Sequence, residues 1–139
     1  SAPKIAAMKA ALSRELPMLT GLGALYGQFD LEQGSNGYNT GFAFPEVLQA
    51  HVAAWQRGDK ALARRIWTHF LPLIVFEQQP GVAVRKELLR RRGLLATGTV
   101  RHPGGALAPV SAAQLGELLD TVMPGVDITQ PLDVAGVIG

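Results

Sequence analysis

The chain of 139 residues contains no cysteine. Disulfide bonds, thiol nucleophiles and cysteine metal sites are therefore excluded, and an intracellular, cytoplasmic protein is the simplest expectation. Long apolar runs are missing as well, because none reaches the ~18 residues that a membrane-spanning helix needs, and no secretory signal opens the sequence. We therefore expect no membrane association.

Charged residues are few, at 17% of the sequence, and the formal net charge is only +2. The one basic run, Arg90 to Arg92, falls in a predicted helix with no aromatic residue interleaved, and we interpret it as a solvated helix face. Nucleic-acid binding would need a larger basic surface. No nucleic-acid partner is expected.

Isolated titratable residues do not form a recognisable site. His51, His69 and His102 have no partner at metal-ligand spacing, so no metal site is predicted. His51 and His69 are expected to be packed or surface residues on helices. Glu46 and Glu77 are isolated carboxylates, and Glu46 is explained as a favourable charge at the start of a helix.

Two further motifs fail on inspection. After Gly21-Leu22-Gly23, a dinucleotide-binding fingerprint would need its last glycine where this chain has Tyr26, and Gly27 comes one residue late. No serine lies in a nucleophile elbow. Taken alone, the residues name no nucleophile, no general base and no metal.

A strand–helix–strand–helix pattern lies near the start of the chain. The expected strands are Pro17–Thr20 and Asn36–Thr40, each followed by a glycine-containing loop. The helix between them is Ala24–Gln33, with Leu25, Phe29 and Leu31 turned inward and Gly34 after its end. This is one repeat of a parallel α/β fold, in which the loops after the strands carry the chemistry. Here those loops are Gly21–Ala24 and Thr40–Phe44.

The rest of the chain is predicted to be mostly helical. Asp59 is a suitable N-cap, Pro72 should kink the helix that follows or leave a carbonyl free, and Ser111 is expected to cap the last helix. The expected helices are Ala2–Leu16, Pro45–Arg57, Lys60–Gln78, Val82–Arg92 and Ala112–Met123, with an irregular connection over Leu94–Pro109 and a loosely docked tail over Pro124–Gly139. Two parallel strands bury too little surface by themselves, so the sequence is expected to be part of a larger unit.

Six segments stand in an order and spacing that resemble a known family. They are the strand into Gly21-Leu22-Gly23, the stretch Gly34–Gly41 (GSNGYNTG), Pro45-Glu46, Arg57-Gly58-Asp59, Pro80 followed by Lys86, and Gly93–Pro103 (GLLATGTVRHP). Over most of residues 2–123 they resemble the C-terminal half of the dihydrodipicolinate synthase / N-acetylneuraminate lyase family. The resemblance implies a (β/α)8 barrel, with the two strands as its last two. Residues 1–57 would belong to the barrel, 58–123 to a C-terminal helical extension and 124–139 to an irregular tail.

The resemblance also implies a reaction. Members of this family form a Schiff base between a lysine and pyruvate or another 2-keto acid, for aldol addition, aldol cleavage or dehydration. That lysine would precede residue 1, so no catalytic residue is expected in this chain. Lys4 falls on the helix after the relevant strand and is rejected, and Tyr26 and Tyr38 do not match the position of the family's tyrosine. No cofactor is implied beyond the covalent adduct.

The family pattern implies a substrate-binding wall made of Gly21, Gly23, Asn39, Thr40 and Gly41. Glycine at positions 21, 23 and 41 would let the backbone approach the ligand closely, although an ordinary tight turn explains these glycines equally well. Members that make dihydrodipicolinate carry Gly-Asp-Asp where this chain has Gly-Leu-Gly-Ala. A 2-keto-3-deoxy sugar acid is therefore at least as good a substrate candidate.

Three functions stay open at this point. The first is the C-terminal segment of a Schiff-base lyase, inactive alone and partnered by the remainder of the barrel, in a homo-oligomer that is a tetramer or a dimer. The second is a non-catalytic binding relative derived from a half barrel. The third is a helical interaction module formed by residues 45–123.

Overall fold

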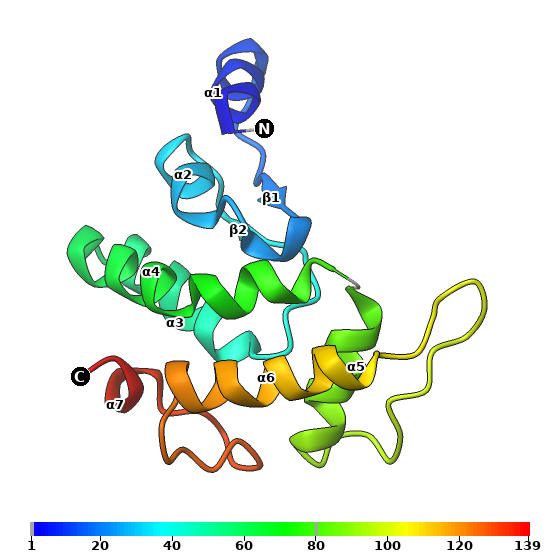
Figure 1. The fold of residues 1–139 in the computed structure, drawn as a ribbon. Coiled ribbons are helices and arrows are strands. Elements are labelled where there is room, and N and C mark those ends of the chain that lie inside the picture. Colours follow the sequence, from blue (N-terminus) through cyan, green and yellow to red (C-terminus); the bar gives the residue numbers. More distant parts are fainter. Residues whose placement is uncertain (1, 80) are drawn as a thin grey trace.

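The computed structural model describes residues 2–79 and 81–139 (Figure 1). Helices dominate it, as expected, and two short strands lie near the N-terminal end. The elements are α1 (Ala2–Ala11), β1 (Leu19–Thr20), the 3-10 helix η1 (Leu22–Ala24), α2 (Gly27–Glu32), β2 (Gly37–Tyr38), α3 (Pro45–Gln56), α4 (Lys60–Glu77), α5 (Val82–Arg91), α6 (Pro109–Val122) and α7 (Val134–Ile138).

The two strands pair in parallel, which confirms the strand–helix–strand prediction. Leu19 is opposite Gly37 and Thr20 is opposite Tyr38. Backbone hydrogen bonds continue the pairing at both ends: Asn36 N donates to the carbonyl of Met18, and Asn39 N donates to the carbonyl of Thr20, each at 2.8 Å. Each strand spans only two residues, fewer than the sequence predicted.

The loop after β1 delays the start of the next helix. Leu22, Gly23 and Ala24 have φ values of 54°, 63° and 64°, in the left-handed region that an α-helix cannot use. For this reason α2 begins at Gly27 instead of Ala24. Phe29, predicted to point inward, is 48% exposed, whereas Leu31 is buried as expected. Gly34 has a φ of 99° and follows the end of α2, as the sequence indicated.

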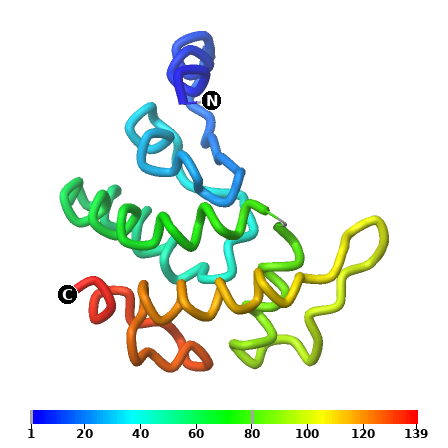
Figure 2. Tube along the Cα trace, in the orientation of Figure 1, coloured from blue at the N-terminus to red at the C-terminus, as the bar shows by residue number. Residues whose placement is uncertain are grey.

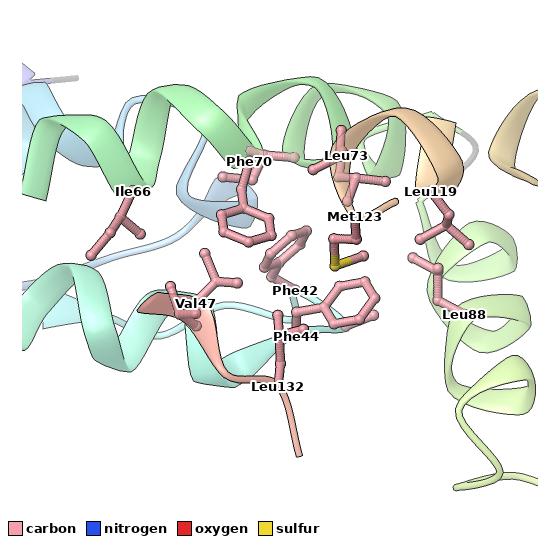
Figure 3. Packing of buried hydrophobic residues seen from close by; sticks show 14 of the residues in the cluster. Phe42, Phe44, Val47, Ile66, Phe70, Leu73, Leu88, Leu119, Met123 and Leu132 are labelled. Carbon is pink, nitrogen blue, oxygen red and sulfur yellow. The ribbon is translucent and has the colours of Figure 1, made fainter. Parts of the chain in front are cut away.

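The hydrophobic core lies below this strand pair, between α3, α4, α5 and α6 (Figures 1 and 3). The loop after β2 contributes Phe42 and Phe44, which pack against Phe70 and Leu73 of α4 and Leu88 of α5. One core therefore contains residues on both sides of position 57. The loop after β2 is part of that core, which fixes its position relative to α4 and α5.

Helix α1 ends earlier than predicted and packs weakly. It stops at Ala11 instead of Leu16, and Ile5 is its one buried residue among those the structure describes. The large apolar side chains of Met8 and Leu12 are 49% and 38% exposed. In Figure 1 this helix lies apart from the core, where α2 is its neighbour. Few other residues of the described chain therefore pack against the apolar side chains of α1.

The predictions for the later helices are partly confirmed. Asp59 caps α4, accepting a hydrogen bond from Leu62 N at 3.0 Å. Helix α4 runs on without interruption through Pro72, whose side chain is exposed. The prediction for Ser111 is wrong: α6 begins at Pro109, since proline needs no N–H partner at the first helical position, and Ser111 lies inside the helix.

The C-terminal segment is more ordered than the predicted loosely docked tail. Leu132 and Val134 are buried in the core, and α7 contacts α3 and α4. Asp133 caps α7, accepting from Gly136 N at 3.2 Å. By contrast, the irregular connection predicted over Leu94–Pro109 extends away from α5 and α6 in the Cα trace (Figure 2).

Candidate functional site

The two loops that follow the strands lie against each other, which brings the predicted binding residues together. Gly23 N donates to the Thr40 hydroxyl oxygen at 2.6 Å, so the first loop is tied to the second. A Cβ atom at Gly21 would lie 3.6 Å from the carbonyl oxygen of Asn39, an ordinary contact. Gly21 and Asn39 are exposed, and Thr40 and Gly41 are half-buried.

Two of the predicted glycines leave room for side chains from the end of α4 and from α5. A Cβ atom at Gly23 would lie 2.1 Å from the amide nitrogen of Gln78, and one at Gly41 would lie 2.6 Å from Nη1 of Arg85. Gln78 follows α4 and Arg85 lies on α5. Packing of these side chains thus accounts for glycine at both positions. Contact with a substrate stays a prediction.

Arg85 is oriented by a buried carboxylate. Its Nε donates to Oε1 of Glu77 at 2.6 Å, and Oε2 of Glu77 accepts from Ala43 N at 3.0 Å. Glu77 is 1% exposed, and burial raises the pKa of its carboxyl group while Ala43 N–H and the Arg85 guanidinium oppose that rise. The sequence interpretation of Glu77 as isolated is therefore wrong. Glu77 is the last residue of α4 and Arg85 lies on α5, so the two are not related by the spacing of a single helix. The local sequence pattern therefore did not indicate their pairing.

Arg92 fixes the same loop from the other side. Its Nη1 donates to the carbonyl of Ala43 at 2.6 Å, Nη2 pairs with Glu46, and Nε reaches the carbonyl of Ile128 at 3.3 Å. Burial acts to raise the pKa of Glu46, but the hydrogen bond from Arg92 brings it below its ordinary value. Arg92 is only 6% exposed, so the interpretation of the basic run as a solvated face is wrong at this residue.

A buried chain of hydrogen bonds lies behind β2. The Tyr38 hydroxyl and His51 Nδ1 are 2.9 Å apart, and His51 Nε2 is 3.0 Å from Oε1 of Gln28. Because the Gln28 amide nitrogen donates to Glu32, its oxygen faces the histidine, which assigns the proton to Nε2. Burial lowers the pKa of His51 to about 4 and raises that of Tyr38. The side chains of His51 and Tyr38 are therefore neutral near pH 7. The burial of His51 confirms the expectation of a packed residue.

An open groove runs along β2 and α3 and ends at Thr40. It has a volume of about 470 Å³ and is lined by Leu19, Gly37, Leu48, Val52 and Gln56, among others. Leu19 is 56% exposed although it lies on a strand. The groove thus lies on the face of the strand pair beside α3, where Leu19 of β1 and Gly37 of β2 are opposite each other.

Across residues 2–79 and 81–139, no group of three His, Asp or Glu side chains is arranged to hold a metal ion. None of the described helices has the length and apolar character needed to cross a membrane.

Comparison with known proteins identifies the fold. A crystal structure of dihydrodipicolinate synthase from Rhodopseudomonas palustris superimposes with a TM-score of 0.80 and 34% sequence identity, over 86% of this chain and 42% of that chain. L-2-keto-3-deoxyarabonate dehydratase of Azospirillum brasilense is 38% identical over 89 residues, which is 62% of this chain and 28% of that protein. No protein-family profile matches the chain.

These matches define first the fold, which corresponds to part of a (β/α)8 barrel and contains few of its strands. More closely, the chain is related to the C-terminal half of the dihydrodipicolinate synthase / N-acetylneuraminate lyase family, as its sequence motifs indicated. It spans less than half the length of either relative.

Proposed function

We propose that this chain is the C-terminal part of a lyase or synthase that forms a Schiff base with pyruvate or a 2-keto-3-deoxy acid. The reaction is aldol addition, aldol cleavage or dehydration. The observation that carries the proposal is the structural match at 34% identity over 86% of the chain. The dehydratase relative, whose name specifies a 2-keto-3-deoxy acid, supports that substrate class.

The chemistry requires a lysine from outside residues 1–139. Its free amine condenses with the ketone of the substrate, and the resulting iminium accepts the electron pair from the bond that breaks. Burial of such a lysine lowers its pKa, which supplies the reactive amine. In this proposal the chain contributes the wall around Gly21, Gly23, Asn39, Thr40 and Gly41, and no further cofactor takes part.

The groove along β2 and α3 supports a second element of the proposal, the remainder of the barrel as partner. A two-stranded parallel sheet exposes N–H and C=O groups at its edges, with which further strands can pair. Leu19 is 56% exposed and lines the groove, so the face of the strand pair beside α3 is also partly uncovered. Two parallel strands gain stability from further neighbours. We therefore propose that strands from outside residues 1–139 extend this pair, and that another segment of the remainder of the barrel covers the groove.

We also propose that the complete protein is a homo-oligomer, either a dimer or a tetramer. Large apolar side chains at the surface, such as Leu22, Tyr26 and Phe29, are available for such contacts. Analytical ultracentrifugation of the complete protein tests this, and a monomer at micromolar concentration would contradict it.

Borohydride trapping tests the proposed reaction. The protein is incubated with pyruvate, reduced, and analysed by intact-mass and peptide mass spectrometry. We expect a stable pyruvate adduct on a lysine outside residues 1–139, and turnover of L-2-keto-3-deoxyarabonate or a related keto acid. The absence of any adduct would overturn the enzyme proposal in favour of a binding or interaction protein, and an adduct on Lys4 or Lys86 would overturn the expected lysine position.

A further inference from the structure

We propose that Arg85, a residue of the helical extension, binds the hydroxyl-bearing end of a 2-keto-3-deoxy acid and so contributes to substrate specificity. This inference rests on the proposed function and goes beyond it, because the sequence motifs placed no binding residue after Gly41. The argument starts from the position of the guanidinium group.

Arg85 lies directly beside the loop that follows β2. Three guanidinium atoms, Nη1, Cζ and Nε, lie 2.6, 2.7 and 3.0 Å from the place a Cβ atom at Gly41 would occupy. A side chain at position 41 would therefore displace Arg85. Thr40, the neighbour of Gly41, is tied to the loop after β1 through Gly23. The guanidinium thus borders the place where the two loops meet.

The pairing with Glu77 holds Arg85 in place and leaves part of its donor fork free. Of the Arg85 donors, only Nε bonds to Glu77. Nη1 and Nη2 of Arg85 have no hydrogen-bond partner among the residues that the structure describes. The Arg85 side chain is 31% exposed. A guanidinium fixed at Nε presents its remaining N–H groups in a defined plane, as ligand recognition requires.

The charge of the pair indicates which substrate group fits. Glu77 is buried and anchored by Ala43 N–H, and it neutralises the guanidinium. The free N–H donors therefore suit neutral oxygens better than a second carboxylate. Hydroxyl groups at the end of a keto-deoxy acid far from its ketone are such oxygens. Pyruvate has none.

The difference between the two substrates provides the test, carried out on the complete protein. Arg85→Lys keeps a positive charge next to Glu77, so the carboxylate stays compensated, but it removes the planar fork. We expect KM for L-2-keto-3-deoxyarabonate to rise about tenfold while kcat changes less than about threefold, as loss of a charged hydrogen bond predicts. The yield and rate of the borohydride-trapped pyruvate adduct should stay unchanged.

Arg91→Lys is the matched control, since Arg91 lies on the same helix but bonds to Glu87 and to the carbonyl of Ala112. An unchanged KM in Arg85→Lys would overturn the inference. So would a loss of pyruvate adduct equal to the loss of turnover, because that would assign Arg85 a role in the site as a whole. If the lysine variant does not fold, Arg85→Met with Glu77→Gln removes both charges and retains an acceptor for Ala43 N–H. Failure of the unaltered protein to form any adduct would refute the proposed function itself.

Discussion

Two buried polar residues, Arg92 and His51, have partners far away in sequence. Arg92 joins Glu46, Ala43 and Ile128, and thereby connects α5 to the loop after β2 and to the C-terminal segment. His51 connects α3 to Tyr38 on β2 and Gln28 on α2. Both residues hold the loop-bearing strands against the helical core, so their role is to position the candidate site.

The pH dependence of stability follows from His51. The pKa of His51 is lowered to about 4 by burial, whereas an unfolded histidine titrates near 6.5. As the pH falls, the unfolded state therefore binds a proton before the folded state does. The contribution of neutral His51 to the free energy of unfolding is fully present above about pH 6.5. It is lost as the pH falls toward 4, and the loss reaches about 3 kcal/mol. We expect the free energy of unfolding, measured in urea at several pH values, to decrease over this window.

His51→Gln is the control for that measurement, since glutamine does not titrate. The decrease between about pH 6.5 and 5 should disappear in this variant, because most carboxylates titrate below that window. An equal slope in the variant and the unaltered protein would show that another group is responsible.

At the scale of elements, local capping explains where α4 begins but not where α6 begins. Asp59 accepts from Leu62 N, whereas Ser111 lies inside α6. Asp59→Ala should therefore cost about 1 kcal/mol of unfolding free energy, and Asp59→Asn, which keeps the acceptor, clearly less. Ser111→Ala should leave the denaturation midpoint nearly unchanged. A Ser111→Ala loss as large as that of Asp59→Ala would contradict the observed start of α6 at Pro109.

The contacts of α4 and α5 with the two strand loops also belong to this scale. Gln78 and Arg85 fill the spaces beside Gly23 and Gly41, so the loops after β1 and β2 are shaped by α4 and α5. The end of α4 and helix α5 therefore border the candidate site as well as the core.

At the scale of the whole molecule, the C-terminal segment closes the core. Leu132 is 8% exposed and belongs to the same cluster as Phe44 and Val47. Leu132→Ala should lower the unfolding free energy by about 2–5 kcal/mol, since it removes buried methyl groups and leaves a cavity. Val110→Ala is the control, because Val110 is 69% exposed and should cost little. Equal midpoints for both variants in urea denaturation would contradict the docking of residues 132–138.

The sequence by itself determined the features that depend on local pattern. The parallel strand pair, Gly34 after α2, α3 and the Asp59 cap of α4 follow from glycine and proline positions, apolar spacing and side-chain chemistry within a few residues. The ordered motifs also indicated the family. Of the predicted binding residues, Gly23 bonds to Thr40 and Gly21 lies against Asn39, because parallel strands place their C-terminal loops side by side. Their contact with a substrate stays a prediction.

Only the tertiary structure decided the burial of Arg92, the pairing of Glu77 with Arg85 and the docking of Leu132. The physical reason is the same in each case. Whether a charge is solvated or buried depends on partners that folding brings from other elements, such as Glu46 for Arg92. Likewise, the apolar spacing around Leu132 cannot reveal whether the core leaves space for its side chain. Gly41 precedes α4 in the sequence and Arg85, whose guanidinium fills the space beside it, follows α4. No local pattern connects the two residues.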